Sequence, residues 1–412
     1  MERQREDSPL LSIVIATRNR IPYAISAIQS ILEIQDTRLE LVVQDNSDSR
    51  GLEAFVKDNL RDGRLRYQYT QSPLSFVGNF NAAVEMATGE YVCVIGDDDG
   101  VNPEILDAAA WAKSNSVDCL AIKTMVGYLW QGTGVSSTLF TKIVGGTLSI
   151  WDFRGFIMEA NAEDEMQKFV RNGAASYLDL DLPKLYHGLV HRRCLQAIHR
   201  KTGAFFGGLS PDIFASLAIA CVAGRVVTTD YPLTIPGACA VSGSVLEGSL
   251  KRHSRKLEDA PHLRHRGYYQ WCELVPRVYT VETLWADSGI NALLAMGRND
   301  LVRQLNRPKL AAYCILANSG VTRAVLRDLF KGMLAEHENQ ALGLVRLIWC
   351  LITGPGLKFA SRVWNRLLLI TGKRSVRNID GLESMTDVTH ALVGYLNQGG
   401  LRFNQELPRV TN

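Results

Sequence analysis

Short runs of apolar residues alternate with amphipathic segments through the first 125 residues of this 412-residue chain. Four runs have the length of buried strands: Leu10–Ala16, Leu39–Val43, Leu65–Tyr69 and Tyr91–Ile95. The segments between them carry apolar residues at helical spacing, and Pro22 lies where the first turn of a helix tolerates proline. Continuous apolar strands that alternate with helices predict a mostly parallel sheet covered on both faces, which is an α/β fold.

The same patterns divide the whole chain. Further helices are expected at Ile21–Leu32, Leu52–Leu60, Val77–Met86, Asn102–Ser114, Trp151–Ala160, Arg192–Lys201 and Pro211–Val222. Further β structure is expected at Asp118–Lys123, in a hairpin over Thr124–Thr147, and at Val226–Ile235. Because the length exceeds that of one usual core, we expect a domain over residues 8–240 with halves 8–125 and 126–240, a basic loop over 241–267, and a mainly helical region over 268–412 that ends in a polar tail.

Composition excludes several classes of protein. A formal net charge of +3 is too small to predict nucleic acid as a partner. No stretch reaches the roughly 18–20 uninterrupted apolar residues of a membrane-spanning helix, because Arg346 interrupts the nearest one, Leu342–Ile352. The eight cysteines form no CxxC pair and Met1–Ser8 is polar, so we expect reduced thiols and a cytoplasmic protein.

Polar residues follow three of the expected strands, in Thr17–Arg20, Asp45–Asp48 and Gly96–Gly100. Ligands of parallel sheets bind beyond the carboxyl ends of the strands, so these segments are the candidate site. The consecutive carboxylates of Asp97–Asp99 repel one another unless a cation compensates them. Mg²⁺ and Mn²⁺ prefer oxygen ligands, and two carboxylates with diphosphate oxygens fill most of an octahedron. The alternative is a solvated acidic turn that caps the next helix.

The other two segments each allow two interpretations. Asp45 can accept a hydrogen bond from a uracil or a ribose hydroxyl, or it can form an Asx turn into the next helix. The Thr17–Arg20 segment offers hydroxyl, amide and cationic donors suited to a base and a phosphate, although Asn19 could equally cap a helix.

Taken in order, these segments resemble the family 2 glycosyltransferases of the GT-A fold. The resemblance rests on Ser12–Arg20, Val42–Asp48, Gly78–Asn81, Ala87–Val92 and Asp97–Asp99, and it covers roughly residues 8–240. It implies an enzyme of the bacterial surface-polysaccharide type. Such an enzyme moves a sugar from a nucleotide donor, here expected to be a UDP-sugar, to a glycan or a lipid-linked acceptor.

The resemblance also implies roles for individual residues. The implied nucleotide-binding residues are Ala16, Thr17, Arg18, Asn19, Asp45, Asn79, Asn81, Asp97 and Asp98. The implied ligands of a Mn²⁺ or Mg²⁺ ion are Asp97 and Asp99, and a histidine such as His253 or His262 completes the metal shell in some related folds.

Displacement at the anomeric carbon requires an acceptor hydroxyl that loses its proton, and a positioned carboxylate suits that task. Members of the family often carry a Glu-Asp pair at the start of a downstream helix, which this chain lacks. Gly207–Pro211 introduces a helix at the expected distance, with Ser210 as its cap, so Asp212 is the predicted base. The alternative is that Asp212 only complements the helix dipole. One acidic base without a carboxylate nucleophile predicts inversion. His187 and His191 are candidate acceptor contacts, although lone histidines are more often structural.

Two basic segments follow. Lys251–Lys256 and His262–Arg266 could close as a lid over the leaving diphosphate or could be a solvated loop. Lys358, Arg362 and Arg366 recur every four residues beside an apolar arc. This pattern indicates a helix that lies on the inner membrane surface as a peripheral contact, or that packs on its own domain or on a second subunit of a homo-oligomer.

Three other functions were compared with sugar transfer. A sugar nucleotidyltransferase needs a glycine-rich phosphate loop after the first strand, and Thr17–Arg20 contains no glycine. A dehydrogenase is disfavoured because no GxGxxG follows that strand. A nucleotide-sugar-binding scaffold without activity is the non-enzymatic alternative, and the intact Asp97–Asp99 triplet and Asp212 argue against it.

Overall fold

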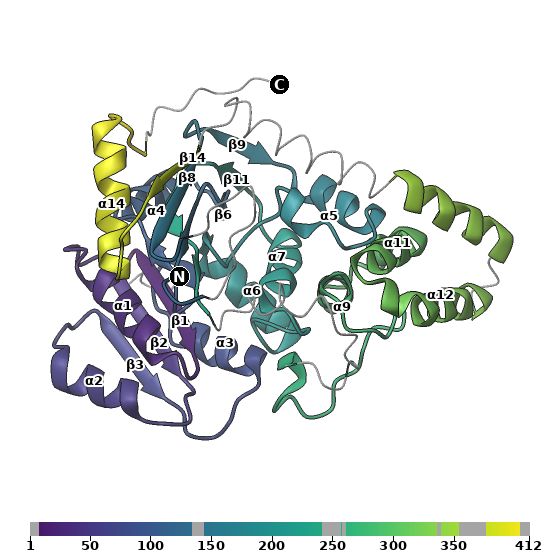
Figure 1. The fold of residues 1–412 in the computed structure, drawn as a ribbon, viewed down its shortest axis with the longest axis horizontal. Coiled ribbons are helices and arrows are strands. Elements are labelled where there is room, and N and C mark those ends of the chain that lie inside the picture. Colours follow the sequence, from purple (N-terminus) through teal and green to yellow (C-terminus); the bar gives the residue numbers. More distant parts are fainter. Residues whose placement is uncertain are drawn as a thin grey trace, which may run out of the picture.

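The computed structural model describes residues 8–133, 144–240, 257, 261–335, 339–353 and 376–403 (Figure 1). Within these residues, the central sheet has the strand order β3-β2-β1-β4-β10-β6-β11-β9. Its strands are β1 (Leu11–Thr17), β2 (Leu39–Asp45), β3 (Leu65–Tyr69), β4 (Tyr91–Ile95), β6 (Cys119–Ile122), β9 (Ile157–Ala160), β10 (Gly188–His191) and β11 (Val226–Thr229).

The sheet is parallel where the sequence pattern is strongest. β1 pairs in parallel with β2 and β4, and β2 pairs in parallel with β3. Strands β10 and β9 run antiparallel to their neighbours. Because β2 and β4 are buried along their whole length, they read as continuous apolar runs rather than as alternating ones.

Helices cover both faces of this sheet. In the first half they are α1 (Ile21–Leu32), α2 (Gly51–Asn59), α3 (Phe76–Glu85), α4 (Ile105–Ser114), α5 (Ala162–Arg171), α6 (Arg192–Thr202) and α7 (Pro211–Ala220). Alternate residues of β1 enter different cores: Ile13 and Ile15 pack with residues of α1 and α4, whereas Val14 packs with residues of α3 and α7. The predicted α/β class with flanking helices is therefore confirmed.

Two small sheets lie beside the central one. β5 (Gly100–Val101) pairs with β12 (Thr234–Ile235), and β7 (Val126–Leu129) pairs with β8 (Thr147–Trp151) and with β13 (Gly237–Ala238). Since β5 begins directly after Asp99, these pairings bring the 234–239 segment against the acidic triplet.

The helix predicted at Trp151–Ala160 is wrong. β8 ends at Trp151, Gly155 adopts a positive φ of 67°, and β9 follows antiparallel to β11. The carboxylate of Asp230 accepts hydrogen bonds from the backbone N–H groups of Arg154 and Phe156, both at 2.9 Å. These bonds and the glycine turn hold the segment extended, and the helix begins only at α5, which Asn161 caps.

The region after Tyr268 is mainly helical, as predicted. It contains α9 (Val281–Ala295), α10 (Asn299–Val302), α11 (Arg307–Ala317), α12 (Thr322–Ala335) and a helix described over residues 340–353. Among the described residues, no helix is both long and apolar enough to span a bilayer. His253, the 241–256 part of the expected lid and the Lys358–Arg366 pattern lie outside the described residues.

The end of the chain is not the polar tail that its composition predicts. β14 (Val376–Ile379) pairs antiparallel with β8, and α14 (Met385–Gln398) lies along α1 (Figure 1). A capping box starts α14, and the hydroxyls of Ser30 and Thr389 lie 3.0 Å apart between the two helices. Residues 376–403 thus pack on the α/β domain rather than within the 268–412 helical region.

Gly89 gives a test of the packing at the start of β4. A Cβ atom at this position would lie 2.6 Å from the backbone nitrogen of Ser12, so Gly89→Ala forces neighbouring backbone apart. We expect this substitution to lower the free energy of unfolding by about 1–3 kcal/mol in urea titrations. Gly63→Ala is the matched control, since nothing lies within 4 Å of its Cβ position, and it should change stability by less than about 0.5 kcal/mol. Equal effects of the two substitutions would contradict this packing.

Candidate functional site

The candidate site begins where β1 and β4 end side by side. Ile15 of β1 is paired with Ile95 of β4, so the residues two positions later, Thr17 and Asp97, are brought together. The Thr17 hydroxyl donates a hydrogen bond of 2.6 Å to Asp97 Oδ2. The sequence therefore placed these two segments correctly at one edge of the sheet.

Arg20 is the cation that pairs with the acidic triplet. Its two terminal nitrogens lie 2.6 Å from Asp97 Oδ1 and 2.7 Å from Asp98 Oδ2. The guanidinium also lies 2.8 Å from the Cys239 sulfur. Asp97 is 1% exposed and Asp98 is 3% exposed, so two buried carboxylates share one guanidinium.

One guanidinium faces two buried carboxylates in this cluster. Burial raises the pKa of Asp97 to about 7, against the opposing attraction of Arg20 and with the repulsion of Asp98 added to it. Burial also raises the pKa of Asp98, and the Asp99 carboxylate raises it further. Arg20 thus compensates the pair only in part.

Asp99 is held differently from its two neighbours. Oδ2 accepts hydrogen bonds from the Gly96 N–H at 2.6 Å and the Tyr186 hydroxyl at 2.9 Å, and it lies 3.1 Å from His187 Nε2. Oδ1 accepts a bond of 2.6 Å from the Gly237 N–H. Burial alone would raise the pKa of Asp99, but His187 and these donors outweigh it and lower that pKa. Asp99 is therefore a fixed anion with both oxygens engaged.

His187 is part of the candidate site because its imidazole contacts the Asp99 carboxylate. Its backbone has a positive φ of 58°, which is unusual for a residue with a side chain. Its Nδ1 is buried and has no hydrogen-bond partner among the described residues. His191, the other candidate histidine, lies at the opposite end of β4 beside Tyr91 and caps α6. His262 packs against the ring of Phe76, with ring centroids 5.7 Å apart.

The 237–239 segment closes over Asp98. The Trp130 indole N–H donates a bond of 2.9 Å to the Asp98 carbonyl, and the Cys239 N–H donates one of 3.2 Å to the Asp98 carboxylate. A Cβ atom on Gly237 would lie 1.8 Å from the Asp98 carbonyl oxygen, so only glycine permits this approach. Sequence reasoning missed these residues because the contacts join segments far apart in the chain.

Hydrogen bonds and an ion pair join the loops that follow β1 and β2. The Asn19 side chain accepts from the Asp48 N–H at 2.8 Å and donates to the Asp48 carboxylate at 2.8 Å. The Asn19 N–H donates to the Ser47 hydroxyl, and Arg18 pairs with Asp48 at 3.1 Å. Asn19 has a φ of 58°, a conformation that asparagine tolerates better than most residues.

Asp45 lies buried between these loops and β3. Its two oxygens accept hydrogen bonds from the Ser47 N–H at 2.8 Å and the Tyr67 hydroxyl at 2.7 Å. The bond from the Ser47 N–H forms the Asx turn that was one of the two interpretations of Asp45. A carboxylate oxygen can accept a second donor, so this geometry leaves a role at the nucleobase open to test. Ala16 is half-buried at the end of β1.

The two asparagines of α3 contact different segments of the chain. The amide of Asn79 donates 3.1 Å to the Thr17 carbonyl, and its buried Oδ1 has no hydrogen-bond partner in the described part of the chain. Asn81 accepts from the N–H groups of Phe205 and Phe206 and donates to the Phe206 carbonyl. The structure brings Asn79 to the site edge, whereas it uses Asn81 to hold the loop before α7.

Asp212 lies in the first turn of α7. Ser210 occupies the N-cap position, but its hydroxyl donates to the Asp212 carboxylate and caps no backbone N–H. Burial raises the pKa of Asp212, and the bond from Ser210 opposes that rise. The Ser288 hydroxyl holds the preceding loop by accepting from the Ser210 N–H at 2.9 Å. One turn further along α7, Ser216 donates to the Pro183 carbonyl, close in sequence to Tyr186.

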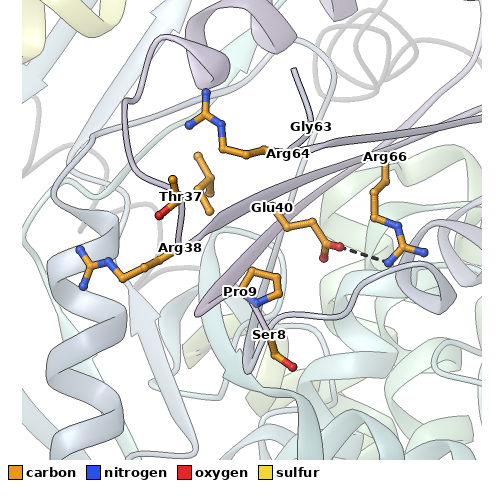
Figure 2. A pocket seen from close by; sticks show the side chains of 9 residues that line it. Ser8, Pro9, Thr37, Arg38, Glu40, Gly63, Arg64 and Arg66 are labelled. Atoms are coloured by element: carbon orange, nitrogen blue, oxygen red, sulfur yellow. Dashed lines mark hydrogen bonds and ion pairs between the residues drawn. The ribbon is translucent and has the colours of Figure 1, made fainter. Parts of the chain in front are cut away.

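A cavity of about 450 Å³ lies at the opposite edge of the sheet (Figure 2). Its lining includes the first residues of β2 and three arginines. Each arginine already has an anionic partner: Arg38 pairs with Asp36, Arg64 with Asp62, and Arg66 with Glu40. This cavity is therefore distinct from the carboxyl-end cluster and offers no unpaired cation.

Comparison with known proteins identifies the first third of the chain. Residues 12–135 match Glycosyl transferase family 2. This part of the chain is therefore similar to a family 2 glycosyltransferase domain. The match agrees with the glycosyltransferase class of enzymes that the sequence motifs predict.

Two curated relatives of this chain are named as sugar transferases. It is 32% identical over 103 residues to WcaA of Escherichia coli K12, described as a colanic acid biosynthesis glycosyl transferase, a match over 24% of this chain and 37% of that protein. It is 33% identical over 96 residues to the GalNAc(5)-diNAcBac-PP-undecaprenol beta-1,3-glucosyltransferase of Campylobacter jejuni, a match over 22% of this chain and 30% of that protein. The matches span between 14% and 37% of the length of the curated relatives.

A solved structure gives a more distant likeness. Crystalline TarS of S. aureus in complex with UDP-GlcNAc aligns with 78% of this chain and 92% of that chain. The identity is 18% and the TM-score is 0.42.

Arg20→Met tests the ion pairs of the cluster. Removing the shared cation from two buried carboxylates should cost on the order of 3–5 kcal/mol of folding stability at neutral pH. A carboxyl whose folded pKa is raised, as that of Asp97 is to about 7, loses stability as pH rises from its unfolded value through its folded one. The deficit of Arg20→Met in thermal melts should therefore be larger at about pH 8 than at about pH 5.

The matched control is Arg18→Met, whose partner Asp48 is exposed. It should show little deficit and no trend with pH. The double variant Arg20→Met/Asp98→Asn should regain part of the lost stability, because it removes one of the uncompensated charges. A pH-independent deficit for Arg20→Met would show that the ion pairs do not stabilise the fold.

Proposed function

We propose that this protein transfers a sugar from a nucleotide donor, with UDP the expected nucleotide, to a hydroxyl of a glycan or a lipid-linked acceptor. One observation carries the proposal. The carboxyl ends of β1 and β4 bring Thr17, Arg20 and the acidic triplet into one buried cluster, at the edge where parallel sheets bind ligands. The Campylobacter relative named as a glucosyltransferase supports a hexosyl donor.

Metal binding depends on whether these carboxylates fit a cation. No three His, Cys, Asp or Glu side chains converge on one metal position in the described residues. In the described residues, buried Asp97 Oδ1 has no partner besides Arg20, and that one guanidinium faces both the Asp97 and the Asp98 carboxylate. These two residues fit a Mn²⁺ or Mg²⁺ ion that is shared with a diphosphate. Such an ion, when bound, neutralises charge on the leaving diphosphate.

The contacts of Asp99 modify the assignment of metal ligands. Backbone N–H groups hold both of its oxygens, whereas the partners of Asp97 are the side chains of Thr17 and Arg20. We therefore propose Asp97 and Asp98 as the residues that hold the cation. Asp99 would then fix the turn that presents them.

Arg20 would complement the donor as well as the carboxylates. A guanidinium is a fork of donors suited to phosphate oxygens. Arg20 is the residue directly before α1. It follows Asn19, whose side chain is hydrogen-bonded to Asp48. We propose that the loop that carries Asn19, with Thr17 and Asp45, receives the nucleoside.

Asp212 is the proposed base. A rigid helix start holds its carboxylate, and its raised pKa makes it a better proton acceptor than an ordinary aspartate. In the proposed step the carboxylate takes the proton of the acceptor hydroxyl as that oxygen attacks the anomeric carbon. The bond to the nucleotide diphosphate breaks on the opposite face, so the configuration inverts. The eight free thiols fit a reducing compartment such as the cytoplasm, which we propose as the location.

Nucleotide binding and donor hydrolysis test the proposal directly. Calorimetry should show UDP binding to the full chain that is tighter with Mn²⁺ than with EDTA, and a screen of nucleotide-sugars with Mn²⁺ should find a donor that is hydrolysed. Asp98→Asn should lose the gain in affinity from Mn²⁺, because it removes one ligand charge, while it keeps metal-free binding. Asp107→Asn, on the exposed face of α4, is the control and should behave as wild type.

Failure of every nucleoside diphosphate to bind would overturn the proposal. Binding of UDP without hydrolysis or transfer of any donor would instead identify a scaffold without activity.

Asp212→Asn tests the base. We expect turnover to fall by about 100- to 10,000-fold with UDP affinity unchanged. A base acts only when deprotonated, so the wild-type rate should rise with pH along an acidic limb whose pKa lies above 3.8, the ordinary value for aspartate. The variant should lack that limb. Normal turnover in Asp212→Asn would exclude this residue as the base.

A further inference from the structure

The helix over residues 340–353 exposes apolar side chains where a solvated helix carries polar ones. Its exposed large apolar residues are Leu342, Leu344, Val345, Ile348, Trp349 and Ile352. Five of them, at positions 342, 345, 348, 349 and 352, recur at helical spacing and share one face, which we call the outer face. Trp349 is 65% exposed and Ile352 is 67% exposed.

The opposite face of the same helix is already covered. Gly343 and Leu347 are buried, and a Cβ atom on Gly343 would lie 1.9 Å from the terminal methyl carbon of Met333 on α12. The half-buried Cys350 and Leu351 pack against the same core. The inner face thus accounts for the attachment of the helix to its domain, and the outer face has no such explanation.

Basic side chains are exposed on this helix and on α12. Arg346 is exposed on the helix itself, and α12 exposes Arg323, Arg327 and Lys331 at four-residue spacing. An apolar helix face with an exposed arginine at its edge complements a surface that is apolar within and anionic at its boundary.

The dimensions favour a lipid surface over a second copy of the chain. A 14-residue helix is about 21 Å long, too short for a hydrocarbon core of about 30 Å. With a diameter of about 10 Å, its outer face offers roughly 200 Å², whereas a stable dimer buries about 800 Å² on each partner. An interfacial helix needs no such area, because it lies in the plane of the bilayer with its apolar side chains between the headgroups.

We infer that the outer face of the 340–353 helix is a docking surface for an anionic lipid bilayer. Val345, Trp349 and Ile352 enter the boundary between headgroups and acyl chains, where tryptophan is favoured. Arg346 reaches from the edge of the face to the headgroup phosphates. The inference goes beyond the proposed function and rests on a part of the fold remote from the acidic cluster (Figure 1).

Co-sedimentation of the full chain with vesicles tests the inference. Wild type should bind vesicles of equal parts phosphatidylglycerol and phosphatidylcholine, and it should bind pure phosphatidylcholine much more weakly. The bound fraction should fall as salt is raised from about 0.1 M to about 1 M, because screening shortens the Debye length from about 10 Å to about 3 Å. Trp349→Gln/Ile352→Gln should partition about tenfold or more weakly, since two apolar anchors are lost.

Leu178→Gln is the matched control. Leu178 is also 67% exposed but lies outside this helical region, so this variant should bind vesicles as wild type does. Melting temperature and UDP affinity should be unchanged in both variants, and the single variant Ile352→Gln provides a milder change if the double variant is unstable. A failed UDP measurement in wild type would concern the proposed function and not this surface.

Three results would overturn the inference. The first is absence of wild-type binding to anionic vesicles. The second is undiminished vesicle binding by Trp349→Gln/Ile352→Gln. The third is a wild-type dimer in light scattering that the same substitutions convert to a monomer, which would identify a second copy as the occupant of the outer face.

Discussion

The sharing of Arg20 between two buried carboxylates is the interaction on which the candidate site depends. Three consecutive aspartates at 1–3% exposure would be costly if they stood alone. Arg20 forms ion pairs with Asp97 and Asp98. Asp99 instead contacts a backbone N–H group, the Tyr186 hydroxyl and the His187 imidazole. The two sets of contacts divide the triplet into a fixed member and a pair with charge still uncompensated. In the proposed function, that residual negative charge attracts a divalent cation, which in turn binds the diphosphate.

Much of the surrounding structure serves to deliver groups to this cluster. Parallel pairing of β1 with β4 sets Thr17 beside Asp97, and the clasp between Asn19 and Asp48 fixes the loop that carries Arg20. On the other side, Asn81 and Ser288 hold the loop that leads to Asp212. These hydrogen bonds hold the loop after β1 and the loop before α7 in place, and so they fix the side chains that the two loops carry.

The sequence predicted the parts of the fold that a local pattern encodes. The bounds of α1, β3 and β4 follow directly from apolar spacing, and the carboxyl-end rule located the triplet and Thr17 together. The sequence pattern could not predict that Arg20 pairs with Asp97 and Asp98, because this pairing depends on how side chains at the ends of two strands are oriented. Asn81 shows the same limit: its amide is used by a loop more than a hundred residues away, and helical spacing carries no sign of that partner. The prediction of a polar tail was wrong for α14, where Met385, Val388 and Leu392 recur at helical spacing after a capping box.

The return of the chain to its own beginning has a consequence for how the protein is made. The hydroxyls of Ser30 and Thr389 meet across 359 positions of sequence, and Met385 lies against Gly100 directly after the acidic triplet. During synthesis, α1 leaves the ribosome long before the helix that covers it. A nascent chain would therefore expose this flank of its first domain until α14 has been made, and closure of so long a loop is slow. Folding would then depend on protecting that flank during translation, and a chain cut short near residue 376 would keep the acidic cluster but leave the α1 surface that α14 contacts exposed.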